Sequence, residues 1–216
     1  MKRTLGIFIA SCAVALLCSP ARATTTFSVV PATIPANPGD VGDGFDVVLT
    51  NNGTGPITVA GFSFEVSVTD PNITFTGASF TTVAYPYIFP DSTDENLSLP
   101  LGTPSGSGQT LDANDTDFSG VGVTLTNGES LSLGFVMFNV ANPATGGPFA
   151  VSFTGTPSVA DANNLSDPLG APITVNNFSD GTIDISGAST PEPSSFLLTL
   201  AGAGALAGWI RRRRLA

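Results

Sequence analysis

Hydrophobic and polar residues alternate along the middle of the chain. Residues 62–69 read FSFEVSVT, so every second side chain is apolar. This period of two is typical of a β-strand with one buried and one solvated face. The same pattern recurs at 45–49, 121–125, 131–135, 149–153 and 183–185. Between residues 24 and 190, no stretch of ten residues follows the period of a helix.

Turn signals separate these runs. Asn-Gly or Asp-Gly pairs at 52–53, 127–128 and 180–181 favour tight hairpins. The pattern therefore predicts an all-β fold, an antiparallel β-sandwich of about nine strands. Residues 85–120 depart from it, because they show little alternation and are rich in Pro, Gly, Ser and Asp. We expect an irregular insertion there.

Basic residues are confined to the two ends of the chain. All 7 Lys and Arg residues lie at positions 2, 3, 22 and 211–214, there is no His, and residues 24–190 hold 16 of the 17 acids. Nucleic-acid binding needs Lys and Arg to displace counterions from phosphates, so this composition excludes it. Catalysis by His, Cys or Lys, or with an arginine clamp, is excluded from the central domain as well.

The beginning of the chain has the features of an export leader. Lys2 and Arg3 precede an apolar run over 5–18, and Ala21 and Ala23 frame a small-x-small cleavage site. A helix over this run rises only about 21 Å, which is too short for a hydrocarbon core of about 30 Å. We therefore predict a signal peptide over 1–23, cut after Ala23. Both cysteines leave with it, so the mature chain forms no disulfide.

The other end predicts a membrane anchor. Residues 196–210 are almost entirely apolar, and as a transmembrane helix they rise about 22 Å, a marginal span that the two preceding serines extend. Four arginines follow directly: Arg211, Arg212, Arg213 and Arg214. They act as a stop-transfer signal that keeps the tail, 211–216, in the cytoplasm and the acidic domain outside.

A Pro-Glu-Pro tripeptide, Pro191, Glu192 and Pro193, stands in the linker over 187–195 before the apolar segment. This order of tripeptide, short Gly- and Ala-rich helix and terminal arginines resembles the PEP-CTERM sorting signal of Gram-negative bacteria. The resemblance implies that a membrane-embedded exosortase recognises the tripeptide, cuts near it and delivers the protein to the surface or extracellular matrix. Two prolines keep this segment extended and poor in amide donors, which suits a processing enzyme. The alternative is a Pro-rich spacer before a permanent anchor.

Strands and turns follow one another in a characteristic order over 31–80. A Pro-Gly-Asp turn at 38–40 is followed by a strand, a turn, a long alternating strand and Asp70-Pro71, and a second strand series runs over 131–185. Over 24–186 this order resembles cohesin-like domains, which are jelly-roll sandwiches. The resemblance implies an interaction module. No dockerin-recognising residues are identifiable, so a dockerin-binding role is not carried over.

Acidic and amide side chains gather at Asp112, Asn114, Asp115 and Asp117. From Asp115, oxygen ligands fall at positions 1, 3 and 5 and a glycine at position 6 of an EF-hand pattern, but Thr126 replaces the glutamate at position 12. One interpretation is a looser Ca²⁺ site made of these four residues, since Ca²⁺ accepts six to eight oxygens. The other is a solvated acidic loop.

Two tyrosines, Tyr85 and Tyr87, are the only ones in the chain. With Phe89, they either form an exposed aromatic patch for a glycan or partner, or contact the core from a strand edge. The alternative function is therefore a carbohydrate-binding module, or a carbohydrate-active enzyme using Asp or Glu residues of 85–120. Such an enzyme needs two carboxylates about 5–10 Å apart.

Together these features predict an exported, exosortase-processed protein of the bacterial surface or of an exopolysaccharide-rich biofilm matrix. It is expected to act as a structural or adhesive interaction module and not as an enzyme. Its expected partners are the exosortase, extracellular polysaccharide or surface proteins, and the membrane before processing. Calcium is the one cofactor that the sequence suggests.

Overall fold

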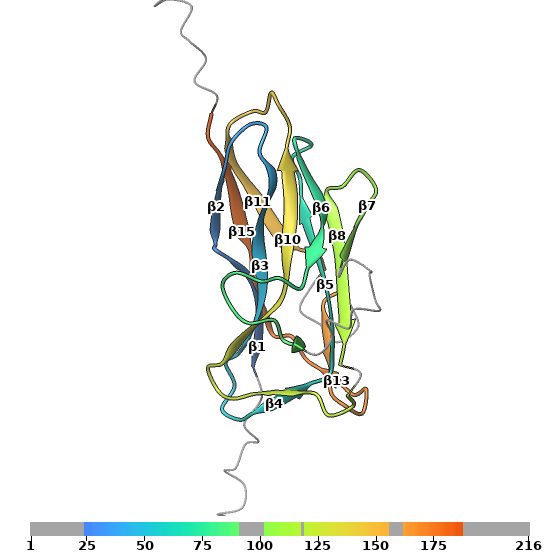
Figure 1. Cartoon of the computed structure of the whole chain (residues 1–216). Helices are drawn as coiled ribbons and strands as arrows, with labels where there is room; N and C mark the ends of the chain where they lie inside the picture. Colours follow the sequence, from blue (N-terminus) through green and yellow to red (C-terminus); the bar gives the residue numbers. More distant parts are fainter. Residues whose placement is uncertain (1–23, 91–101, 118, 156–161, 188–216) are drawn as a thin grey trace, which may run out of the picture.

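Two layers of β-sheet pack face to face in the computed structural model (Figure 1). The structure describes residues 24–90, 102–117, 119–155 and 162–187. The predicted all-β sandwich is confirmed, and these residues form 15 strands. Within them, no helix has the length and apolar character needed to cross a membrane. The predicted leader, Pro-Glu-Pro linker, C-terminal helix and arginine tail lie outside these ranges.

The first layer is built around two long antiparallel strands, β3 (Val41–Asn51) and β10 (Ser130–Val140). β1 (Thr25–Val30) flanks β3, and β6 (Ile73–Ser79) flanks β10, both in antiparallel pairing. A parallel strand, β14 (Asn177–Ser179), completes the layer beside β1.

The second layer is centred on β5 (Gly61–Val68), which pairs antiparallel with β8 (Thr110–Thr116) and β11 (Gly147–Phe153). On one side, β7 (Gly102–Ser105) pairs with β8 and also with β6, so that it joins the two layers. On the other side, β15 (Gly181–Ile185) pairs with β11, and β2 (Thr33–Ala36) forms the edge beside β15. Short ladders close one end: β4 (Ile57–Val59) with β9 (Val123–Leu125), and β12 (Asn164–Ser166) with β13 (Pro172–Ile173). These short pieces explain why the number of strands exceeds the nine expected.

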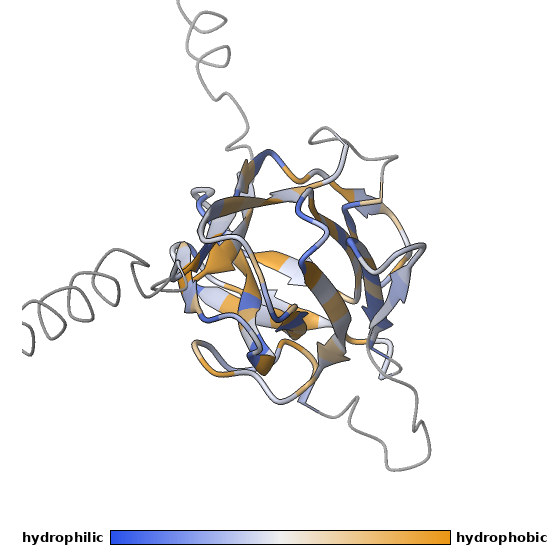
Figure 2. Ribbon diagram, turned by 90° about the horizontal axis from the view of Figure 1, so that it is seen from above, coloured by the Kyte–Doolittle hydropathy of each residue, from blue (hydrophilic) through white to orange (hydrophobic). Residues whose placement is uncertain are grey.

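Phenylalanine fills the space between the layers. The largest fully buried side chains include Phe27, Phe45, Phe64, Phe75 and Phe138. Their rings pack at angles, for example Phe45 against Phe75 with ring centroids 6.3 Å apart. Figure 2 shows the strands enclosing this common interior when the molecule is seen from above. Because the described residues contain no basic side chain, burial and hydrogen bonds rather than ion pairs hold the layers together.

A β-bulge in β10 changes which of its residues face the core. The alternation predicts Leu131, Leu133 and Phe135 on one buried face. Instead, the register against β3 shifts between Ser132 and Gly134, and Val136 and Phe138 are fully buried while Phe135 turns to the outer side. The prediction for Phe135 was therefore wrong, because the extra residue of a bulge inverts the phase of the alternation after it.

A hairpin occupies part of the segment predicted to be irregular. β7 and β8 lie within residues 85–120, joined by a turn that contains Gly106 and Gly108. In β8, Leu111 and Ala113 are buried, and the residues between and after them are polar. The prediction of irregular structure was therefore wrong for residues 102–105 and 110–116, which are strands of the second layer.

The two ends of the described chain leave the domain at opposite poles (Figure 1). β1 begins at the pole that carries β4 and β13, whereas β15 ends at the other pole. The segment that leads to the sorting motif therefore departs from the pole opposite the one at which the chain enters the domain.

Candidate interaction face

The alternation of β8 separates the residues of the predicted calcium site. Asp112 and Asn114 are exposed on the outer side of the strand, while Asp115 is half-buried on the side of Leu111 and Ala113. Asp115 Oδ2 accepts a hydrogen bond of 2.5 Å from the Tyr87 hydroxyl. The structure therefore does not bring these acids to one point.

Asp117 organises its own loop. Its Oδ1 accepts the Ser119 amide at 2.9 Å, and its Oδ2 accepts the Ser119 hydroxyl at 2.6 Å and the Gly122 amide at 2.7 Å. The bonds from Ser119 lower the pKa of the carboxyl below its usual value. Within the described residues, no three acidic side chains come close enough to hold a metal ion. The predicted four-residue calcium site is not assembled in this part of the chain.

A different pair of carboxyl groups does meet, on the outer side of the second layer. Glu65 of β5 lies directly opposite Asp112 of β8. A hydrogen bond to the Glu65 side chain, together with burial and charge repulsion, raises the pKa of Asp112 to about 6. Glu65 Oε1 also accepts the Thr154 hydroxyl. We call Glu65 and Asp112 the carboxyl pair.

Sequence reasoning missed the role of Glu65. The alternation along β5 places the Glu65 side chain on the solvated face, together with Ser63 and Ser67, and the sequence alone predicts this. The strand opposite it follows 47 positions later in the chain, and no local pattern reveals that pairing. Only the register of β5 with β8 identifies Asp112 as its neighbour.

Polar side chains surround the carboxyl pair. Outward-facing residues at neighbouring register positions are Ser63, Ser67, Thr103, Ser105, Thr110, Asn114 and Ser152. With the carboxyl pair they form what we call the polar face, over β7, β8, β5 and β11. Asn163 supports its edge, accepting the Glu65 amide at 2.9 Å and donating to the Thr154 carbonyl at 2.5 Å. The polar face is thus an open sheet surface that offers hydrogen-bond acceptors and contains no basic side chain.

The carbohydrate-active alternative requires a different geometry. Glu65 and Asp112 are in hydrogen-bond contact, whereas glycosidases separate their carboxyl groups by about 5–10 Å to admit a sugar bond. The pair also lies on an open sheet instead of in a concave site. The carboxyl pair therefore lacks the separation that a glycosidase pair has.

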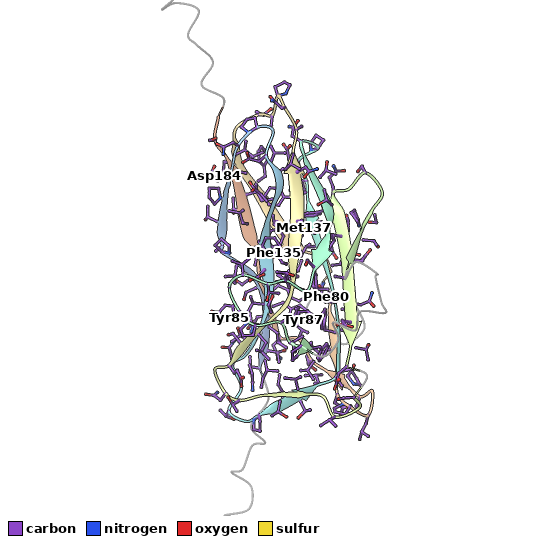
Figure 3. The ribbon with its side chains drawn as sticks, in the orientation of Figure 1. Phe80, Tyr85, Tyr87, Phe135, Met137 and Asp184 are labelled. Carbon is purple, nitrogen blue, oxygen red and sulfur yellow. The ribbon has the colours of Figure 1, made fainter. Side chains whose placement is uncertain are left out.

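The outer face of the first layer differs from the polar face, because it carries apolar and aromatic side chains (Figure 3). Phe135 and Met137 of β10 are half-buried there, and the segment that follows β6 crosses this face with Tyr85 exposed. Asp46, only 1% exposed, anchors the crossing segment by accepting the Val83 amide at 3.0 Å and the Ala84 amide. Burial raises the pKa of Asp46, although these backbone bonds oppose the rise.

The two tyrosines have different environments. Tyr87 is 8% exposed, and its ring meets those of Phe62, Phe80 and Phe89 at centroid distances of 5.3–6.4 Å. Burial and the bond to Asp115 raise the pKa of its hydroxyl above the usual range. Tyr85 is 40% exposed. They do not form one patch: Tyr87 contacts the core, as the second interpretation expects, and Tyr85 alone is available at the surface.

The end of the chain matches a known sorting signal. The family model that matches is described as the PEP-CTERM protein-sorting motif, and it covers residues 189–214. The chain carries a PEP-CTERM sorting motif. The match includes Pro191, Glu192, Pro193 and the four arginines, so it confirms the resemblance found in the sequence. No curated protein matches the chain.

Solved structures identify the fold of the domain. A cohesin from Clostridium acetobutylicum superposes with a TM-score of 0.56 at 18% identity, covering 78% of this chain and 94% of that one. A cohesin from Clostridium thermocellum, solved in a complex with a dockerin, gives 0.52 at 11% identity, covering 76% and 99%. The sixth cohesin of scaffoldin B from Acetivibrio cellulolyticus, also solved with a dockerin, gives 0.53 at 15% identity, covering 76% and 99%.

The chain therefore combines a PEP-CTERM sorting motif with a cohesin-like β-sandwich fold. At these identities the likeness establishes the fold and carries no residue-level role. The polar face and its carboxyl pair are features of this chain, identified from its own contacts.

Proposed function

We propose that this protein is exported, processed by an exosortase and retained at the bacterial surface, where its cohesin-like domain binds a protein partner through the polar face. A signal peptide over 1–23 starts export, and the apolar segment over 196–210 holds the chain in the membrane until processing. The observation that carries this proposal is the combination of a sorting motif with a domain of an interaction fold.

The polar face is the part of the domain whose chemistry suits a charged partner. Its carboxyl pair lies beside hydroxyl and amide groups on a flat surface, and no basic side chain of residues 24–190 can neutralise it. A partner that presents Lys or Arg would separate the two carboxyl groups and form charge-assisted hydrogen bonds with each. Two of the cohesins with similar folds were solved bound to dockerins, which supports a protein as the partner.

Processing is tested by the mass of the protein extracted from the cell surface. We expect loss of the residues after the Pro-Glu-Pro segment in cells that have the exosortase, and an intact tail in cells that lack it. Replacing Pro191, Glu192 and Pro193 by alanine should have the same effect as loss of the enzyme. An intact tail in every sample would leave only a permanent anchor.

Docking through the polar face is tested by surface retention. Asn114→Arg places a bulky cation on the polar face next to the carboxyl pair, and Thr76→Arg places the same group on the exposed side of β6 in the other layer. We expect Asn114→Arg to release the processed protein into the medium, while Thr76→Arg stays on the cells. Equal retention of the two variants would argue against the polar face as the docking surface.

A further inference from the structure

An open pocket lies at the pole where the chain enters the domain. Its volume is about 910 Å³, within the range of ligand-binding pockets. Its apolar lining consists of Ile57, Val121, Pro168, Leu169, Pro172 and Ile173. We call it the distal pocket, because the segment leading to the sorting motif leaves from the opposite pole (Figure 1). It shares no residue with the polar face.

Two aliphatic side chains at this pocket are exposed on hydrogen-bonded turns. Leu169 is 93% exposed and Val121 is 72% exposed. Asp167 Oδ1 fixes the first turn by accepting the Leu169 amide at 2.9 Å and the Ala171 amide at 2.8 Å. Asp117 fixes the second through the Gly122 amide, next to Val121. An exposed apolar side chain contributes no burial energy to folding. The exposure of Leu169 and Val121 at the same pocket therefore points to binding.

The walls of the pocket are closely packed against one another. Gly122 has φ +74°, and a Cβ there would lie 2.9 Å from the Thr58 methyl carbon and 3.0 Å from the Pro168 ring, so the β9 end and the 167–171 turn are closely packed. Thr58 and Thr124 join β4 to β9 by a 2.9 Å hydroxyl bond. A preformed pocket of this kind avoids part of the ordering cost of association.

The acidic side chains around the pocket favour a cationic occupant. Asp167 lines it and Asp117 holds its rim, while residues 24–190 contain no basic side chain. Within the described residues, Asp167 Oδ1 takes both turn amides, which leaves Oδ2 as an acceptor for an incoming cation. Apolar walls beside carboxylates complement an aliphatic side chain with Lys or Arg next to it in sequence.

The chain itself does not supply that occupant. A second copy of the processed chain would bring the same carboxylates face to face, and its residues 24–190 contain no cation to pair them. The chain's own basic residues lie in the predicted signal peptide and in the tail over 211–214, which is expected in the cytoplasm before processing and is expected to be lost with the apolar segment afterwards. We propose that the distal pocket binds a peptide segment of another protein in which an aliphatic residue is flanked by basic residues.

The test uses the full-length protein in phosphatidylcholine nanodiscs, with the methyl groups of Ile, Leu and Val labelled with ¹³C for NMR. The probe is a capped peptide with leucine between two lysines. The matched peptides replace the lysines by glutamates or the leucine by serine. We expect saturable shifts of the Leu169, Val121 and Ile173 methyls with the probe alone. The methyls of Val41, 78% exposed elsewhere in β3, should not move.

Variants separate the apolar and the charged contributions. The double variant Leu169→Ser and Val121→Ser should weaken the probe at least tenfold without changing the melting temperature, because both side chains are exposed. Asp167→Asn keeps an oxygen for the turn amides and should weaken the probe about threefold and reduce its salt dependence. Val41→Ser is the control and should bind as the wild type does.

Three results would overturn the proposal. The glutamate peptide could shift the methyls as strongly as the lysine peptide, which would remove the argument from charge. The double variant could bind with wild-type affinity, which would place the contact elsewhere. The same methyls could shift with protein concentration alone, which would make the pocket a contact between copies of this chain.

Discussion

Glu65 and Asp112 stand directly opposite each other on β5 and β8, with their carboxyl groups hydrogen-bonded. Two like charges at such a cross-strand position oppose sheet formation. Residues 24–190 contain no basic side chain, so no ion pair within the domain relieves the repulsion. A proton shared between the two groups does, and this links the stability of the second layer to pH.

The first prediction concerns the pH dependence of stability. The pKa of Asp112 is raised from 3.8 to about 6 in the folded domain, so the folded state binds this proton more tightly than the unfolded chain. The resulting stabilisation is complete below about pH 4 and is lost as the pH rises through 6. Asp46 and Asp43 have raised pKa values as well and act in the same direction. We expect the melting temperature to be higher at pH 5 than at pH 8, by roughly 2–6 °C.

Below about pH 4 we expect the domain to lose stability for a different reason. The pKa values of Asp117 and Glu129 are lowered, because their carboxylates accept hydrogen bonds in turns. Their contribution is present above about pH 4 and is lost as the pH falls through the lowered values. Thermal unfolding followed from pH 3 to 8 should therefore give a maximum near pH 4–5. A melting temperature that is constant or rises from pH 5 to 8 would contradict the shared proton.

The second prediction isolates the carboxyl pair. Asp112→Asn replaces the shared proton by an amide donor, which pairs with Glu65 at any pH. We expect it to raise the melting temperature at pH 8 by roughly 2–4 °C and to have little effect at pH 4.5. Asp184→Asn, an exposed acid of β15, removes the same formal charge without a carboxyl neighbour opposite it. An equal gain in both variants would assign the effect to net charge alone.

The sequence predicts the local features of this molecule better than its long-range pairings. The alternation over 62–68 defines β5 correctly, since each second residue is buried. The sequence pattern does not predict β8, because Leu111 and Ala113 are its only buried apolar residues among Asp, Asn and Thr. In β10 the bulge inverts the phase, so Phe135 is assigned to the wrong face. Backbone pairing produces this bulge, and side-chain periodicity does not report it.

The candidate sites also differ in whether the sequence alone can identify them. Pro191, Glu192 and Pro193 are read as a linear motif, so sequence alone identifies them. The four proposed calcium ligands fail to meet because successive residues of a strand point to opposite faces, and Asp112 and Asp115 differ in parity. The carboxyl pair and the distal pocket join segments far apart in the chain, and their recognition requires the topology.

The third prediction concerns the segment that crosses the first layer. Asp46→Ala leaves the amides of Val83 and Ala84 without their acceptor, so we expect the segment to open. Hydrogen bonds to a charged group contribute about 1.5–3 kcal/mol, so losing them should accelerate hydrogen exchange at these two amides on the order of tenfold or more. Asp70→Ala is the control, because Asp70 caps only the Asn72 amide in another turn. Equal exchange at Val83 and Ala84 in both variants would mean that Asp46 does not hold the segment.

The last prediction separates the two tyrosines. Tyr87→Phe keeps the ring contacts with Phe62 and Phe80 but removes the 2.5 Å hydrogen bond to Asp115. We expect a loss of about 0.5–1.5 kcal/mol in the free energy of unfolding, measured by denaturant titration at pH 7. Tyr85→Phe removes an equal hydroxyl from an exposed ring and should change the stability by less than about 0.5 kcal/mol. If Tyr87→Phe were as stable as the wild type, the half-buried Asp115 would not depend on this hydroxyl, and the contact between the β6–β7 segment and β8 would rest on ring packing alone.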